Sequence, residues 1–236
     1  MFVEGQTELV FVRTLLLRTA DLSRLSFECL ELLSHKDSTV PYHYASPIAD
    51  VHFLILCVRG DDTVVSAISE RGDRLFGNGY ERIIGLRDLY SDEYSKLSHG
   101  VLDHSISEVV MKRHFETVRR LAHSDAISLH FAVMETEAWI LGMHALFPKL
   151  DSVLTAEHVE HTLGVDLRAI DPEEQFYKPS EQVRLIMESC GHQYKKRLAE
   201  IETLCSKMTQ QDFADAKERD RCQSFRRFSQ EMADCQ

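Results

Sequence analysis

Acidic residues follow within three positions of the end of each short apolar segment of this chain, and this pattern constrains its fold more than any other feature. The segments are residues 51–58, 82–86 and 126–134. The first is almost continuously apolar, as is typical of strands that are covered on both faces of a parallel sheet, and the other two are mainly apolar. Asp88 follows the second segment, and Glu135 and Glu137 follow the third. Because the carboxyl ends of parallel strands meet at one edge, we expect these acids to crowd together, and crowded carboxylates need a cation or shared protons.

The start of the chain repeats the pattern on a smaller scale. The apolar residues 1–3 are followed by Glu4, Gly5, Gln6, Thr7 and Glu8. We predict a short strand, a turn at Gly5 and a helix over 7–19 with Thr7 as its N-cap. Glu4 would then end the strand and Glu8 would face it from the first helical turn. Two converging carboxylates predict an Mg²⁺ site, because hard cations take oxygen ligands. The alternative is a capped turn in which Glu8 only favours the helix dipole.

These residues carry a resemblance to a known family. The opening Val3-Glu4-Gly5-x-Thr7-Glu8 resembles the first motif of toprim domains, the Mg²⁺-binding α/β module of topoisomerases, primases and the overcoming-lysogenization-defect nucleases. More specifically, four segments are similar to the toprim-like family of domain of unknown function 4276. They are residues 3–11, 84–90, 134–139 and 219–225, with 176–179 between the last two. The segments span nearly the whole chain in the order of that family.

The resemblance implies a fold, a cofactor and an activity. The fold would be α/β, toprim-like and Rossmann-like, with a mainly parallel sheet flanked by helices. The cofactor would be Mg²⁺ or Mn²⁺, with Glu4, Glu8, Asp88 and Glu137 as its ligands. Together with Glu135, these acids would be the catalytic residues of a metal-dependent nuclease or phosphodiesterase.

One departure from the toprim pattern leaves the activity open. A toprim domain ends the corresponding strand in Asp-x-Asp, whereas this chain has Asp88 followed two positions later by Tyr90. Glu135 or Glu137 would have to supply the missing oxygen. The departure favours an alternative, a non-catalytic metal-binding interaction subunit of a complex that contains an ATPase. A receiver-like phosphoacceptor domain fits poorly, because no lysine closes the last strand.

The partners implied by the resemblance are a nucleic acid and a separate ATPase, in a prokaryotic defence or mobile-element setting. The formal charge of −11 argues against a broadly basic surface, so contact with nucleic acid would be local or supplied by a partner. Lys178, just before Pro179, is a candidate contact for a substrate phosphate, and the alternative is an ordinary loop lysine. We interpret the basic residues 195–197 as a charged helix surface.

Composition indicates a soluble, cytoplasmic protein. Hydrophobic residues make up 44% of the chain, and no segment approaches the roughly 18 apolar residues of a membrane span. The six cysteines form no Cys-x-x-Cys pair, which suits reduced thiols in a cytoplasm better than a disulfide framework.

The order of the patterns predicts an α/β domain over 1–150 and a helical C-terminal extension over 151–236, packed on that domain. Within the first part, residues 25–33 fit a strand or a helix. We expect a loop over 36–49, a helix over 61–76 capped by Asp61 or Asp62, and a polar connection over 91–104. Ser105 and Glu108 form a capping box that opens the next helix. In the second part, helices are predicted over 155–163, 180–190, 193–207 and 210–232.

Overall fold

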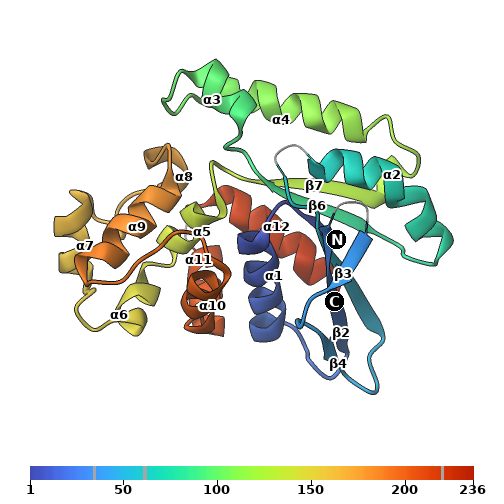
Figure 1. Ribbon diagram of the computed structural model, residues 1–236, viewed down its shortest axis with the longest axis horizontal. Coiled ribbons are helices and arrows are strands. Elements are labelled where there is room, and N and C mark those ends of the chain that lie inside the picture. The colour runs from blue at the N-terminus through green and yellow to red at the C-terminus, as the bar shows by residue number, and fades with distance from the viewer. Residues whose placement is uncertain (34–35, 61–62, 219–220) are drawn as a thin grey trace.

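The centre of the structure, a computed structural model that describes residues 1–33, 36–60, 63–218 and 221–236, is a mainly parallel sheet (Figure 1). Its strands are β1 (Phe2–Val3), β2 (Leu25–Leu33), β3 (Lys36–Thr39), β4 (Tyr44–Ala45), β5 (Val51–Cys57), β6 (Ile83–Asp88) and β7 (Ile127–Ala132). They lie in the order β3-β2-β5-β1-β6-β7, with β4 paired to β2. Only β3 and β4 run antiparallel to their neighbour among the described strands. The expected α/β fold with a mainly parallel sheet is confirmed.

Helices cover both faces of this sheet (Figure 1). They are α1 (Gln6–Thr19), α2 (Thr63–Gly77), α3 (Asp92–Ser98), α4 (His104–Val118), α5 (Thr136–Gly142), α6 (Phe147–Leu150), α7 (Ala156–Leu163), α8 (Pro172–Gln175), α9 (Pro179–Ser189), α10 (Leu198–Ser206), α11 (Gln210–Glu218) and α12 (Gln223–Asp234), with short 3₁₀ turns at Ser124–Ala126 and His144–Leu146. On one face, Val64 of α2 and Val110 of α4 share a core with Phe2 of β1. On the other, α1, α5 and α12 share a larger core with the sheet. None of the described helices is long and apolar enough to cross a membrane.

A cluster of aromatic side chains joins the C-terminal helices to the rest of the molecule. Its members are Phe11, Trp139, Phe213, Phe225 and Phe228, and neighbouring ring centroids lie 5.4–6.3 Å apart. All five side chains are almost completely buried. Residues after 150 therefore complete the core that α1 and α5 begin.

The central strand β1 has only two residues but is held on both sides. It pairs in parallel with β5 and with β6. Directly after it, the backbone N–H of Glu4 donates to the carbonyl of Leu86 over 3.2 Å, and that of Val58 donates to Val3 over 2.9 Å. Pairing on both sides fixes the backbone at Glu4 despite the short strand.

Two segments that we expected to be irregular contain regular structure. Residues 36–49 include β3 and β4, which pair antiparallel with β2, so the prediction of a loop there was wrong. Residues 91–104 include α3, whose first turn is capped by the Ser91 hydroxyl accepting from the Tyr94 N–H. Tyr94 is fully buried, and this burial favours a helix in a segment whose composition is polar. Residues 25–33, which fitted either element, form strand β2 between β5 and β3.

The expected helix caps are corrected at two places. Helix α1 begins at Gln6 with Gly5 as its N-cap residue, rather than with Thr7 as the cap. Helix α4 is capped by Asp103, whose carboxylate accepts from the N–H groups of Ser105 and Ile106. Asp103 stands two positions before the predicted capping box and is an equally good cap by residue type.

In the C-terminal part, the predicted helix over 210–232 is two helices. The chain turns between α11 and α12, where Cys222 has a left-handed backbone (φ 49°), and this turn brings Phe225 back against Phe11. The predicted helix over 193–207 begins only at Leu198. The proposed caps Asp61 and Asp62, and the first two residues of the 219–225 segment, lie outside the described residues.

Candidate metal centre at the carboxyl edge of the sheet

The acids predicted from the strand pattern stand at one edge of the sheet. Glu4 follows β1, Asp88 ends β6, and Glu135 and Glu137 lie at the start of α5, just after β7. Asp88, Glu135 and Glu137 each place a carboxylate oxygen within 4.8 Å of the other two. Glu8 reaches the same edge from the first turn of α1. Three carboxylates at this spacing could hold a metal ion, and oxygen donors suit a hard divalent cation.

Thr136 connects Asp88 to Glu8. Its backbone N–H donates to Asp88 Oδ1 over 2.9 Å, and its hydroxyl lies 3.0 Å from Glu8 Oε1 and 3.1 Å from Asp88 Oδ1. One hydroxyl has one proton, so it can donate to only one of the two carboxylates at a time. Burial, and then the charge of Glu8, raise the pKa of Asp88 well above its usual range, while Lys196 opposes the rise. Asp88 therefore retains a proton more readily than an exposed aspartate.

Glu4 lies beside a buried arginine. Arg87, on β6, is fully buried, and its Nε lies 3.5 Å from Glu4 Oε2. The guanidinium also stands over the ring of Phe131, 5.5 Å from its centroid. A Cβ atom on Gly5 would stand 3.0 Å from Glu8 Oε2, so the missing side chain leaves room for that carboxylate at the turn. Glu4 and Glu8 thus border the three-acid group: Glu4 lies beside Arg87, and Glu8 shares the Thr136 hydroxyl with Asp88.

A lysine from the loop between α9 and α10 adds a positive charge beside Glu135 and Glu137. Lys196 Nζ lies 2.8 Å from Glu135 Oε1 and 3.0 Å from Glu137 Oε2. Burial alone would lower the pKa of Lys196, but the charges of Glu137, Asp88 and Glu135 outweigh it and raise the pKa. Its backbone is left-handed (φ 52°), a conformation that side-chain-bearing residues seldom adopt. The ammonium group compensates the charge of the crowded acids.

Further side chains orient the two glutamates of α5. Ser180 donates to Glu135 twice, from its N–H over 2.7 Å and from its hydroxyl over 2.9 Å. The buried Tyr194 hydroxyl donates to Glu137 Oε1 over 2.7 Å. Burial raises the pKa of Glu137, with Lys196 as the main opposing influence. Both carboxylates are therefore held in fixed positions.

Sequence reasoning missed four of these residues: Thr136, Ser180, Tyr194 and Lys196. The interpretation of 195–197 as a helix surface was wrong, because α10 begins at Leu198 and Lys196 turns inward from the loop. The one sequence signal for a role of Lys196 was its place in the basic cluster 195–197 of a strongly acidic chain. The other three have no local signal, since they are common residue types that become relevant only through contacts distant in sequence.

The predicted phosphate contact Lys178 lies near the acid edge but contacts an aromatic ring. Its Nζ stands 5.4 Å from the ring centroid of Tyr90, and the side chain is exposed. Tyr90 also packs edge-on against Tyr177. The second position after Asp88 therefore holds an aromatic residue with an aromatic neighbour. The phosphate role of Lys178 stays a prediction.

A large groove opens at the opposite edge of the sheet. It has a volume of about 1010 Å³ and is lined by the beginning of β5, the residues before β6 and the end of α12. Asp88, Glu135 and Glu137 are not among its lining residues. We place the candidate site at the carboxyl edge nevertheless, because reactive groups converge there and open α/β sheets bind ligands at that edge.

Comparisons with protein-family models, with curated proteins and with solved structures found no match for this chain. The toprim-like relationship accordingly stays a hypothesis that rests on the residues quoted above. The donor set itself fits a divalent cation, because it consists of carboxylates from two neighbouring strand ends.

Proposed function

We propose that this chain is a Mg²⁺- or Mn²⁺-dependent phosphodiesterase, of the nuclease type that the toprim-like motifs imply. The observation that carries the proposal is the convergence of Asp88, Glu135 and Glu137 within 4.8 Å at the carboxyl edge of a parallel sheet. These three residues would hold the cation, with Glu4 and Glu8 beside them. When bound there, a divalent cation supplies charge neutralisation and polarisation of a phosphoryl oxygen.

The chain's own residues have defined tasks in this proposal. Thr136 orients Asp88, and Tyr194 orients Glu137. In the metal-free protein, burial favours the protonated forms of Asp88 and Glu137, and both carboxyl groups must be ionised to hold the cation. Lys196 is 35% exposed, so its ammonium group could leave the acids for a substrate phosphate once a cation compensates their charge.

The substrate and partners are proposed from the resemblance and from the charge of the chain. A net charge of −11 provides little long-range attraction for a nucleic acid backbone at physiological salt. A separate ATPase that delivers or reshapes a nucleic acid would supply what the chain lacks. The setting would be prokaryotic defence or a mobile element, in the cytoplasm.

A second candidate, a non-catalytic interaction subunit, is favoured by Lys196 and Tyr90. The ammonium group of Lys196 already pairs with Glu135 and Glu137, and Tyr90 replaces the second aspartate of the toprim pattern. An interaction subunit that still binds metal would differ from the phosphodiesterase only in the absence of cleavage. A subunit in which Lys196 permanently replaces the cation would in addition not respond to metal ions.

Metal binding to the folded state is expected to stabilise the wild-type protein. At a Mg²⁺ or Mn²⁺ concentration about 100 times the dissociation constant, the free energy of unfolding should rise by about 2.7 kcal/mol through mass action. Thermal melts with and without metal measure this rise. Asp88→Asn and Glu137→Gln should abolish it, while Glu108→Gln, an exposed acid on α4, should retain it. A wild-type protein that does not respond would favour the non-catalytic candidate.

The isolated chain is expected to cleave labelled DNA or RNA weakly or not at all. The missing second aspartate and the acidic surface both reduce productive binding of a phosphodiester. Cleavage assays with Mn²⁺ and Mg²⁺, with wild type and Asp88→Asn side by side, test this expectation. Rapid cleavage by the wild-type chain alone would contradict it. Cleavage that survives in Asp88→Asn would place the activity elsewhere.

A further inference from the structure

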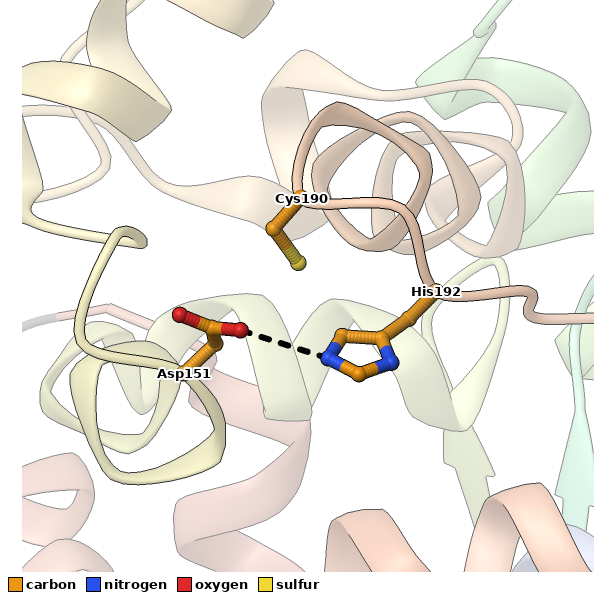
Figure 2. A group of neighbouring side chains, drawn as sticks. All are labelled: Asp151, Cys190 and His192. Carbon is orange, nitrogen blue, oxygen red and sulfur yellow. Dashed lines mark hydrogen bonds and ion pairs between the residues drawn. The ribbon is translucent and has the colours of Figure 1, made fainter.

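A second group of potential metal ligands lies away from the acid edge, in the C-terminal helices. Asp151 directly follows α6, and Cys190 and His192 lie at the end of α9 (Figure 2). One donor atom from each of the three lies within 4.8 Å of the other two. His192 Nε2 and Asp151 Oδ2 are 3.3 Å apart. The three side chains thus bring a sulfur, a nitrogen and an oxygen donor to one place.

The backbone holds these donors in position. Gly191, between Cys190 and His192, has φ 84°, a left-handed conformation that glycine adopts without strain. The N–H of His192 returns to the carbonyl of Met187 over 3.0 Å, so the chain reverses at the helix end and both side chains lie on the same side. Asp151 is fixed by its own turn, in which Oδ1 accepts from the N–H of Val153 over 2.9 Å.

The orientation of the imidazole distinguishes a metal site from a nucleophilic triad. In a Cys-His-Asp triad, the thiol and the carboxylate face opposite ring nitrogens. In Figure 2 the Cys190 sulfur and the Asp151 carboxylate both lie toward Nε2 of His192, and Nδ1 lies on the far side of the ring. Convergence of all three donors on one point is what a bound cation requires.

The structure assigns to Asp151, Cys190 and His192 a site for a borderline divalent cation of the Zn²⁺ class. A thiolate and an imidazole favour Zn²⁺ over Mg²⁺, which prefers oxygen donors. A tetrahedral zinc site with ligand distances of about 2.0–2.3 Å keeps donor atoms about 3.3–3.8 Å apart, so the side chains need to close by about 1 Å. His192 is 52% exposed, which leaves room for water as a fourth ligand beside the three described donors.

This site would anchor the loop that reaches the acid edge. Cys190 and His192 begin the segment between α9 and α10, and Tyr194 and Lys196 on the same segment contact Glu137. A cation bound to Cys190, His192 and Asp151 would connect that loop to the end of α6. Binding at this site requires neither the acid edge nor catalysis.

Cobalt substitution tests the assignment on the reduced, metal-free full chain. Titration with Co²⁺ should produce a thiolate-to-cobalt absorption band that saturates at about one ion per chain. Zn²⁺ should displace Co²⁺ and thereby abolish the band, whereas excess Mg²⁺ should leave the band unchanged. Cys190→Ser should eliminate the band, and Asp151→Asn and His192→Ala should each weaken Co²⁺ binding by about tenfold or more.

Two control variants show where the ion binds. Cys235→Ser, at another half-buried cysteine, and Asp88→Asn, in the acid edge, should both retain the full band. No band in the wild type, or a band that persists in Cys190→Ser, would overturn the assignment. If Cys190→Ser does not fold, alkylation of wild-type Cys190 supplies the answer. Zn²⁺ should protect this thiol at least about tenfold, and equal alkylation with and without Zn²⁺ would overturn the assignment.

Discussion

Replacing Lys196 with methionine is expected to lower the free energy of unfolding of the metal-free protein by about 2–3 kcal/mol. The substitution leaves Glu135 and Glu137 buried without their cationic partner, while it keeps the length of the side chain. A fully buried pair would lose about 3–5 kcal/mol, but Lys196 is 35% exposed and water screens part of the charge. Urea unfolding in the presence of a chelator measures the change.

The matched control is Lys195→Met, which removes an exposed lysine next to the site and should change stability by less than about 0.5 kcal/mol. Added Mn²⁺ should raise the free energy of unfolding of Lys196→Met more than that of the wild type. In the variant the ion does not have to compete with the ammonium group. Equal losses in the two variants would mean that the Lys196 ion pairs contribute nothing to stability. If Mn²⁺ does not stabilise Lys196→Met, the result would favour the non-catalytic candidate.

The loss in Lys196→Met should also depend on pH. In the wild type the pKa of Lys196 is raised, so its stabilising contribution is present below its usual pKa and is lost only as the pH rises through the raised value. The contribution also needs charged carboxylates, and burial raises the pKa of Glu137. The difference between wild type and variant should therefore be largest where Lys196 and Glu137 are both charged. It should shrink as the pH falls and Glu137 takes up a proton, because a neutral Glu137 tolerates burial alone. A loss that grows as the pH falls would contradict the ion-pair explanation.

Replacing Trp139 with alanine is expected to lower the free energy of unfolding by about 3–5 kcal/mol. The Trp139 ring is completely buried and stacks on Phe228, with ring centroids 5.4 Å apart. Its single Nε1–H is shared between Glu173 Oε1, at 2.9 Å, and the Ser224 hydroxyl oxygen, at 2.7 Å. The variant loses both the volume of the indole and the donor shared by the buried Glu173 and the half-buried Ser224. Chemical denaturation monitored by circular dichroism measures the effect.

Two further variants separate the contributions of the indole. Trp139→Phe keeps an aromatic ring and removes the donor, so a loss of about 1–3 kcal/mol is expected. Phe115→Ala, at a ring that is 37% exposed on α4, should lose less than Trp139→Ala. A loss below about 1 kcal/mol in Trp139→Ala would mean that the C-terminal helices do not unfold together with the sheet.

The sequence by itself determined strands β1, β5, β6 and β7 and the order of acids along the chain. The apolar runs at 51–58, 82–86 and 126–134 correspond to β5, β6 and β7, because the pattern of a doubly covered strand is local. Parallel pairing then puts every acid that follows such a strand at one edge, whatever else surrounds the sheet. The strand pattern alone therefore predicts the edge at which Asp88, Glu135 and Glu137 converge.

Only the tertiary structure decided which groups complete that edge. Lys196 comes from a loop 61 residues after Glu135, and its inward direction depends on a left-handed backbone that no propensity predicts. Residues 25–33 form a strand because β5 lies beside them, and α11 and α12 separate because their aromatic faces meet α1. Strand patterns are properties of neighbouring residues, whereas charge compensation and packing arise between segments distant in sequence. Charge compensation and packing therefore exist only once the chain has folded.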